Sequence, residues 1–242
     1  MKKLFDGFAL AFSMLTIVPF FKVHHFFKGI NGYSAMFYPL VGALLGATLY
    51  GIYIFLTPYL PQPHLHLLLF ALLVILTGAL HLDGLSDSID GFFVAKERSL
   101  EVMKDSHVGG MGMIFTFVFL SVKLSAFLYL ENVVLLIPIL LLSRLNALFA
   151  IYFFNYVSSG VGALLKSELK LRYLAFASLY SVAVVLYFAN LWFVVVSLFT
   201  LGVIATLLTR RLGGLNGDSY GFIIEMSELV LLHFAMVVVW LK

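Results

Sequence analysis

The chain has 242 residues, of which 62% are hydrophobic and only 11% are charged, and its mean hydropathy is +1.07. Because soluble domains are only about half apolar, this composition excludes an ordinary soluble protein and indicates an integral membrane protein. The net charge of +3 gives no support for nucleic-acid binding. The absence of cysteine excludes disulfides, thiolate nucleophiles and thiolate metal sites.

The first apolar segment, residues 4–21, is short and contains Asp6 and Pro19. A membrane-spanning helix needs about 20 predominantly apolar residues, so we expect an interfacial or re-entrant helix here rather than a span. We expect no cleavable signal peptide, because Asp6 interrupts the apolar run that follows Lys2 and Lys3.

Seven longer apolar runs follow, and each is long enough to cross a bilayer as a helix. The sequence therefore predicts an all-α, polytopic membrane helix bundle of about seven transmembrane helices, plus the N-terminal interfacial or re-entrant helix. No internal repeat or linker stands out, so residues 1–242 are expected to form one integral membrane domain. The seven runs are residues 34–57, 64–82, 112–130, 133–156, 172–188, 190–208 and 222–241.

Lysine and arginine are distributed unevenly between the two sides of the predicted bundle. The N-terminus and the segments 21–33, 83–111, 157–171 and 209–221 share one side, which carries 12 of the 15 Lys and Arg residues, whereas only Lys242 falls opposite. The positive-inside rule assigns the basic side to the cytoplasm. We therefore expect a multi-pass protein of a bacterial or archaeal cytoplasmic membrane, with an active site that faces the cytoplasm.

Residues 77–112 carry six of the 12 acidic residues of the chain. Asp83, Asp87 and Asp90 are spaced i, i+4 and i+7, which places three carboxylates on one face of a helix. Clustered like charges favour a hard divalent cation such as Mg²⁺, which prefers oxygen ligands. Asp105 follows close by as a further acidic residue. The alternative is a solvated polar loop between two membrane helices.

Two histidines flank this acidic stretch. His81 lies two residues before Asp83, and His107 lies two residues after Asp105. Each of the two is either a proton acceptor or an interfacial residue that forms hydrogen bonds, and the sequence does not decide between these roles.

A second polar segment, residues 210–221, reads RRLGGLNGDSYG and combines Arg210 and Arg211 with glycines. Its backbone amides can approach an anion closely, but the segment is neither a Walker sequence nor a dinucleotide-binding fingerprint. The alternative is an ordinary glycine-rich loop at a helix end. Glu225 and Glu228 follow, either as acids that complement the helix dipole or as a second acidic cluster.

Arg144 lies near the middle of the predicted fourth span, where a charged side chain requires a partner. Its planar guanidinium suits phosphate, which predicts an anion ligand. The alternative is a structural ion pair with an aspartate of residues 83–90, or with Glu225 or Glu228. Lys123, in the third span, either snorkels to the interface or stays inside, and the sequence leaves this open.

An acidic helix face, a basic glycine-rich loop and a buried arginine together suggest Mg²⁺-dependent chemistry on a diphosphate. Two other classes fit some of the same residues. One is an intramembrane Mg²⁺-dependent prenyltransferase, which usually needs two separate aspartate-rich motifs. The other is an ion-coupled transporter with Asp87, Arg144 and Glu225 as its relay, which predicts charges spread through midplane positions.

Four motifs, in the order of the chain, resemble the cobalamin synthase family of adenosylcobinamide-GDP ribazoletransferases: HLDGLSDSIDGFF, ERSLEVMKDSHVGGMG, SRLNALFA and RRLGGLNGDSYGFIIEMSEL. FSMLTIVPF and YPLVGALLGA are similar to the same family. The resemblance implies the last assembly step of the cobalamin nucleotide loop, in which α-ribazole or its 5′-phosphate is joined to adenosylcobinamide-GDP and GMP is released, with Mg²⁺. In this chemistry we expect a 5′-hydroxyl to attack the cobinamide-linked phosphorus.

The resemblance also suggests site residues, whose individual roles are our inference. Small-molecule substrates and the lipid bilayer are the expected partners, nucleic acid is not, and the oligomeric state stays open, a homo-oligomer included. The expected metal ligands are Asp83, Asp87, Asp90 and Asp105. The expected catalytic residues are Asp83, Asp105 and His107. The expected phosphate and substrate contacts are Lys104, Arg144, Arg210, Arg211, Gly214, Asn216, Asp218, Glu225 and Glu228.

Overall fold

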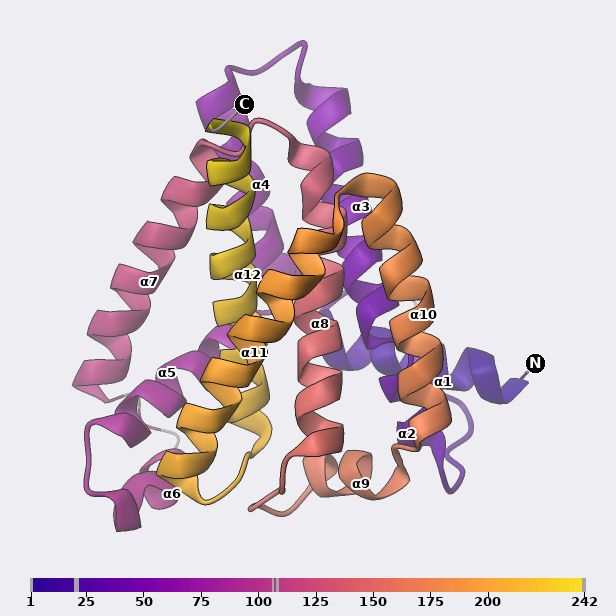
Figure 1. The fold of residues 1–242 in the computed structure, drawn as a ribbon, viewed down its shortest axis with the longest axis vertical. Helices are drawn as coiled ribbons and strands as arrows, with labels where there is room; N and C mark the ends of the chain where they lie inside the picture. Colours follow the sequence, from indigo (N-terminus) through magenta and orange to yellow (C-terminus); the bar gives the residue numbers. More distant parts are fainter. Residues whose placement is uncertain (1, 20–21, 106, 108, 241–242) are drawn as a thin grey trace.

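The computed structural model describes residues 2–19, 22–105, 107 and 109–240, and this part of the chain consists of helices, their connections and one isolated β-bridge (Figure 1). Short helices precede and separate the long ones. The helices in chain order are α1 (Lys2–Leu15), α2 (Ile30–Ala35), α3 (Tyr38–Leu56), α4 (Gln62–Leu76), α5 (Leu80–Phe92), η1 (Lys96–Arg98), α6 (Ser99–Val102), α7 (Gly110–Leu128), η2 (Val133–Leu135), α8 (Leu136–Phe153), α9 (Val161–Glu168), α10 (Leu171–Phe188), α11 (Leu191–Leu212) and α12 (Gly217–Trp240).

Six helical segments of the described chain are long and apolar enough to cross a membrane, namely α3, α7, η2 with α8, α10, α11 and α12. The helices α4 and α5 pass the same test as a pair, which gives up to seven spans. The structure therefore confirms the predicted all-α, polytopic membrane helix bundle.

The helix α8 forms the centre of this bundle (Figure 1). In its span 89% of the residues are buried, compared with 28–50% in the other five candidates. It packs against α3, α10, α11 and α12. A helix that is apolar on every side has to be surrounded, and here the other helices surround it while their own apolar outer faces remain exposed.

Two glycines let α3 approach α8 closely. A Cβ atom on Gly46 would lie 2.6 Å from the Cα of Ile137, and one on Gly42 would collide with the carbonyl oxygen of Leu140. Helix association in membranes depends on van der Waals contact, which small residues four positions apart make tight. The pair thus fixes the most extensive helix contact of the core.

The predicted span at residues 64–82 is wrong at its C-terminal end. The helix α4 ends at Leu76, and α5 leaves it at an angle of 81°. Between them Gly78 and Ala79 have φ angles of 61° and 55°, in the left-handed region that L-residues avoid. The N–H of Ile17 donates to the carbonyl oxygen of Leu76 at 2.9 Å, so the chain that follows α1 packs on this break.

The N-terminal helix α1 is only 14 residues long and runs across the spanning helices rather than along them (Figure 1). It contacts α2 and α3 and buries Phe12 and Leu15. This agrees with the expected interfacial or re-entrant helix. The predicted segment 4–21 also includes residues 20–21, which lie outside the described residues.

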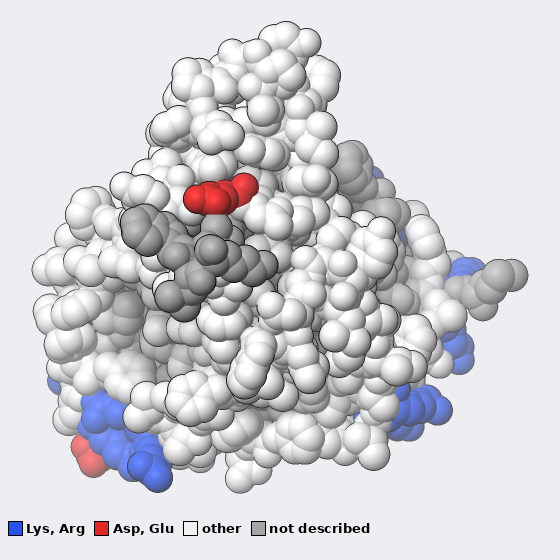
Figure 2. All heavy atoms as spheres, turned by 45° about the horizontal axis from the view of Figure 1, so that its top comes forward, with Lys and Arg blue, Asp and Glu red and all other residues white. Residues whose placement is uncertain are grey.

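The two ends of the bundle differ in charge. In Figure 1 the C-terminus and the connection between α10 and α11 lie at one end, and α6 and α9 lie at the other. Figure 2 looks obliquely onto the first end. Apart from the residues drawn in grey, its middle shows one acidic group, and Lys and Arg lie along the edges of the view. This arrangement matches the uneven distribution of basic residues between the predicted loops.

Candidate functional site

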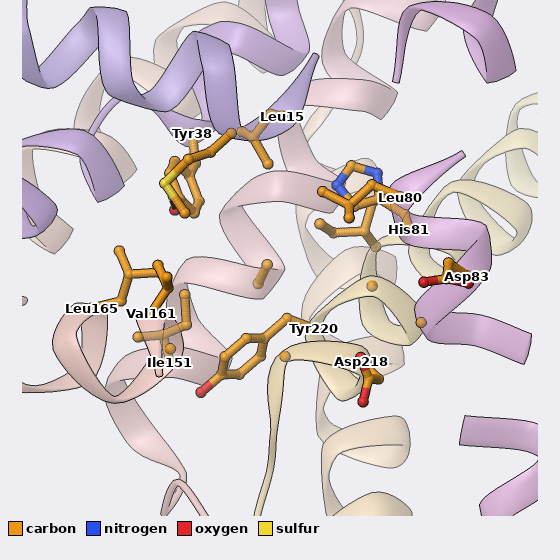
Figure 3. Close-up of a pocket in the computed structure, with 17 residues that line it drawn as sticks. Leu15, Tyr38, Leu80, His81, Asp83, Ile151, Val161, Leu165, Asp218 and Tyr220 are labelled. Carbon is orange, nitrogen blue, oxygen red and sulfur yellow. Dashed lines mark hydrogen bonds between the residues drawn. The ribbon is translucent and has the colours of Figure 1, made fainter. Parts of the chain in front are cut away.

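A cavity of ≈ 300 Å³ lies where α1, α3, α5, α8, α9 and α12 meet (Figure 3). Much of its wall is apolar, including Leu15, Leu80, Ile151, Val161 and Leu165. Its polar side chains are Tyr38, His81, Asp83, Asp218 and Tyr220. A pocket with apolar walls and a few polar groups is the usual form of a small-molecule site.

Three carboxylates gather at one side of this cavity. Asp83 and Asp218 line it, and the charges of both act on Asp87, one turn further along α5. Gly84 lets α5 approach α12 closely, because a Cβ atom at this position would lie 2.9 Å from the Cα of Asp218. Among the described residues none of the three carboxylates is paired with Lys or Arg, so their mutual repulsion is not offset by a protein cation.

These carboxylates fit the way in which Mg²⁺ binds at phosphate-transfer sites. Within the described ranges no group of three or more His, Asp or Glu side chains is placed so that all of them could hold one metal ion. Mg²⁺ is commonly held by one or two carboxylates, and water and substrate phosphates complete its shell. Asp83 and Asp218, with Asp87 beside them, are the residues that could hold it.

Asp90, the third residue of the predicted acidic face, binds backbone amides instead of facing the cavity. Its carboxylate is buried and accepts the N–H of Gly109 at 2.9 Å and the N–H of Gly112 at 2.7 Å. These amides lie at the start of α7, where backbone N–H groups lack partners within the helix and a negative charge is favourable. Both oxygens thus tie α5 to α7, and we leave Asp90 out of the metal set.

The structure places Asp105 and His107 in the exposed connection between α6 and α7. Asp105 accepts hydrogen bonds from the ring Nδ1 of His107 at 2.7 Å and from its backbone N–H at 3.0 Å. These bonds, the side-chain one first, hold the pKa of Asp105 below its usual value. Neither residue lines the cavity, and neither does the exposed Lys104. The catalytic roles of Asp105 and His107 stay predictions, since of the three expected catalytic residues only Asp83 lines the cavity.

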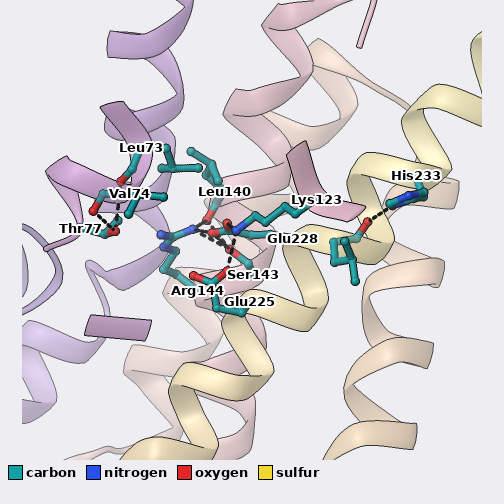
Figure 4. Close-up of polar contacts among 11 residues, drawn as sticks. Leu73, Val74, Thr77, Lys123, Leu140, Ser143, Arg144, Glu225, Glu228 and His233 are labelled. Atoms are coloured by element: carbon teal, nitrogen blue, oxygen red, sulfur yellow. Dashed lines mark hydrogen bonds and ion pairs between the residues drawn. The ribbon is translucent and has the colours of Figure 1, made fainter. Parts of the chain in front are cut away.

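Arg144 belongs to a buried ion cluster (Figure 4). It pairs with Glu228, while the Nζ of Lys123 lies 2.6 Å from a carboxylate oxygen of Glu228 and 2.6 Å from one of Glu225. These side chains are at most 6% exposed, and none of them lines the cavity. For Arg144 the structure therefore shows the ion-pair alternative, and Lys123 stays inside the bundle.

The two arginines at the end of α11 have different surroundings. Arg211 donates to the carbonyl oxygens of Gly91 and Phe92, at 3.2 Å each, and also to that of Val94. A cation is favourable at carbonyls that a helix leaves without partners, so Arg211 stabilises the C-terminal end of α5. Arg210 is exposed, and its predicted contact with phosphate stays a prediction.

The rest of the glycine-rich segment positions Asp218. Gly214 packs on the backbone oxygen of Asn155. Asn216 caps α12, because its Oδ1 accepts the N–H of Ser219 at 2.9 Å. The same side chain donates from Nδ2 to Asp218 at 2.9 Å. The predicted substrate contacts Gly214 and Asn216 thus hold a carboxylate of the cavity in place.

The sequence did not indicate several parts of the cavity wall. Tyr38 and Tyr220 line it, as do Val161, Gly162 and Leu165 from α9, a helix within a segment predicted only as a loop. Tyr220 lies inside the glycine-rich motif, which was the one signal available for it. The other wall residues come from separate elements, so no spacing in the sequence connects them.

Comparisons with known proteins give a consistent result. A family model described as cobalamin-5-phosphate synthase matches residues 7–236. The adenosylcobinamide-GDP ribazoletransferase of Desulfitobacterium hafniense is 36% identical over 240 residues, which cover 92% of this chain and 93% of that protein. The enzyme of the same name from Pseudomonas fluorescens is 37% identical over 214 residues, covering 83% and 86%. No solved structure matches the chain.

Proposed function

The chain belongs to the cobalamin-5-phosphate synthase family, and we propose on this premise that it catalyses the ribazoletransferase reaction. It is an enzyme of cobalamin biosynthesis that transfers the cobinamide-phosphate moiety of adenosylcobinamide-GDP to α-ribazole or its 5′-phosphate. The products are adenosylcobalamin, or its 5′-phosphate, and GMP. The observation that carries this proposal is the family match over residues 7–236, to which the acidic cavity adds chemical support.

The family description supports a different nucleophile from the 5′-hydroxyl expected from the sequence. It names a 5-phosphate product, and an oxygen that already carries a phosphate cannot attack. Another ribose hydroxyl therefore forms the new bond to the cobinamide-linked phosphorus, while the bond from that phosphorus to the oxygen of GMP breaks. The hydroxyl proton passes to a base or to water, and GMP leaves with the electron pair of the broken bond.

The acidic side of the cavity is where we place the diphosphate. Asp83 and Asp218, with Asp87 beside them, are the carboxylates that would hold Mg²⁺ there, and the ion, when bound, neutralises the charge that grows on the phosphate oxygens. Asp83 and Asp218 belong to different helices, so the packing of Gly84 on Asp218 sets the distance between these ligands. Lys104 and Arg210 are exposed cations that we retain as phosphate contacts. The protein's main contribution is to align the two reactants.

We place the enzyme in the cytoplasmic membrane, with the cavity toward the cytoplasm. This orientation is supported by the excess of Lys and Arg in the segments on the side of α5, α6 and α9. It also suits the reaction, because the substrates are charged and GMP is released into water.

The first experiment follows GMP and the cobamide product by chromatography. Purified protein in detergent receives adenosylcobinamide-GDP, α-ribazole and Mg²⁺, and a parallel sample receives EDTA. We expect both products to appear only with Mg²⁺. Since detergent solution holds no ion gradient, product formation also excludes the transporter alternative. The absence of product from folded protein with validated substrates would overturn the proposed function.

Substitution of a proposed ligand tests the acidic site. We expect Asp83→Asn and Asp87→Asn to lower GMP release by about 100-fold or more, because charge stabilisation at the reacting phosphate is lost. Thermal melting should show that the variants remain folded. The control Glu131→Gln changes an exposed carboxylate at the opposite end of the bundle and should leave turnover unchanged. Equal GMP release by wild type and both aspartate variants would remove the metal assignment.

A further inference from the structure

The two substrates of the proposed reaction differ greatly in size. One carries a corrin macrocycle with its side chains and a nucleotide, and the other is a flat aromatic base joined to a ribose. The cavity of ≈ 300 Å³ lies at the lower end of the range for small-molecule sites, about 300–1,000 Å³. A volume of this size matches the nucleoside more closely than the corrinoid.

We propose that this cavity is the binding site of the aromatic nucleoside, and that Tyr220 and His81 are the residues that recognise it. The base occupies the apolar end, and the ribose lies at the end that carries Asp83 and Asp218. This inference rests on the proposed function, because it divides the substrates of that reaction between two parts of the site.

The first support is that two buried polar groups in the cavity wall have no partner. His81 is 4% exposed and Tyr220 is 8% exposed. Among the described residues, neither ring nitrogen of His81 has a hydrogen-bond partner, and the hydroxyl of Tyr220 has none either. Buried polar groups are normally paired, and leaving them unpaired is unfavourable. Both residues line the same cavity, so one ligand bound there would lie beside both side chains.

The second support is how these groups are placed (Figure 3). The Tyr220 hydroxyl points toward Ile151 and Val161, at the apolar end, whereas His81 lies toward the end that carries Asp83. A benzimidazole base has one unprotonated ring nitrogen, which accepts from the tyrosine O–H. A neutral imidazole has one donor and one acceptor, which suits a ribose hydroxyl. A nucleoside held in this way presents its ribose to the carboxylates that would hold the metal.

The test is a kinetic separation of the two substrates. Tyr220→Phe removes only the hydroxyl, and Ala147→Leu extends a residue of the cavity wall on α8 into the cavity. We expect each variant to raise the KM for α-ribazole by about tenfold and to leave the KM for adenosylcobinamide-GDP unchanged. Calorimetry with α-ribazole alone should show the same loss. The control Tyr187→Phe removes a hydroxyl on the outer face of α10, where the residue is 82% exposed.

Two further measurements sharpen the result. His81→Gln keeps a donor and an acceptor and should bind α-ribazole better than His81→Leu. The analogue of α-ribazole that lacks the two base methyl groups should be less affected by Ala147→Leu, because the smaller base leaves room for leucine.

The outcomes separate this inference from the proposed function. If the wild type forms no product, the proposed function fails. If the wild type is active but Tyr220→Phe and Ala147→Leu raise only the KM for adenosylcobinamide-GDP, or neither KM, then the cavity is not the nucleoside site while the function stands. Because Tyr220→Phe is nearly isosteric, the test does not depend on how well Ala147→Leu folds.

Discussion

Lys123, Arg144, Glu225 and Glu228 place two cations and two anions inside the bundle, on α7, α8 and α12. Charges at this depth are costly to bury and are tolerated only when paired. Ser143 adds to the pairing, because its hydroxyl accepts from Arg144 at 2.8 Å. The cluster is formally balanced, so removal of any one member leaves an uncompensated buried charge.

We therefore predict that Glu228→Gln destabilises the protein by about 3–5 kcal/mol, the usual cost of breaking a buried ion pair. Thermal or denaturant unfolding in detergent measures this loss. The double variant Lys123→Met/Glu225→Gln removes one charge of each sign and should lose less than Lys123→Met alone. Glu131→Gln, in an exposed loop, serves as the control. A Glu228→Gln variant with the unfolding midpoint of the wild type would refute the coupling.

For the candidate site residues, the sequence indicated which side chains share a helix better than it indicated their roles. The spacing of Asp83, Asp87 and Asp90 correctly placed them on one helix. It could not show that Asp90 would accept hydrogen bonds from the backbone N–H groups of Gly109 and Gly112, because those partners lie 19 and 22 residues further along the chain. Helical periodicity relates residues within a few turns only, and the fate of each carboxylate depends on which helix packs beside it.

At the level of elements, the break between α4 and α5 gives the acidic helix its direction. Gly78 has a φ of 61°, and a Cβ atom there would collide with the side chain of Ile17. We predict that Gly78→Ala destabilises the protein by about 1–3 kcal/mol through backbone strain and this clash. GMP release should also fall, because α5 carries Asp83.

A matched substitution and a double variant check this explanation. Gly51, in α3, has no atom within 4 Å of an added Cβ, so Gly51→Ala should be neutral or slightly stabilising. Adding Ile17→Ala to Gly78→Ala should recover the steric part of the loss but not the strain. Unfolding curves of the four proteins measure both parts. If Gly78→Ala and Gly51→Ala behaved alike, the break would not depend on the glycine.

The connection between α2 and α9 provides a prediction about pH. Glu168 accepts the backbone N–H groups of Gly29 and Asn31, at 2.9 Å each. Partial burial acts to raise the pKa of Glu168, but the hydrogen bonds from Gly29 and Asn31 outweigh it and hold the pKa below the usual value. A carboxylate with a lowered pKa in the folded state stabilises the protein above its unfolded pKa, and the effect disappears as pH falls through the folded pKa.

The wild type should therefore melt above Glu168→Gln near neutral pH. The difference should shrink as the pH falls below about 4.3, the ordinary pKa of glutamate. Melting curves between neutral and acidic pH measure the difference. Glu97→Gln, which changes an exposed glutamate, should show no difference at any pH. A gap that grew on acidification would have the wrong sign for this account.

The elements themselves were predictable where hydropathy governs them. Long apolar runs gave α3, α7, α8, α10, α11 and α12, since a membrane allows few alternatives to a helix. Hydropathy could not show the break after Leu76, because Thr77, Gly78 and Ala79 are all compatible with a continuous apolar helix. The left-handed backbone there becomes visible only once Ile17 is packed against it.

For the whole molecule, the cavity could not be predicted, although the fold class could. Its wall combines α1, α3, α5, α8, α9 and α12, and which of these meet depends on how the spans surround α8. The charge asymmetry, by contrast, needs only the order of spans and loops. It is therefore the property of the whole molecule that the sequence predicts most directly, and it predicts an orientation that can be tested.

The absence of cysteine makes this orientation measurable with single-cysteine variants. Ser159→Cys places a thiol in the exposed connection between α8 and α9, and Glu131→Cys places one in the loop between α7 and η2, at the opposite end (Figure 1). A membrane-impermeant maleimide added to intact cells with a permeabilised outer envelope should label Glu131→Cys, while Ser159→Cys should react only in inverted vesicles. The reverse pattern would place the cavity outside the cytoplasm, where GMP could not return to the nucleotide pool. Labelling of both from one side would require an even number of crossings between α7 and α9, which is incompatible with α8 as the single buried span that connects them.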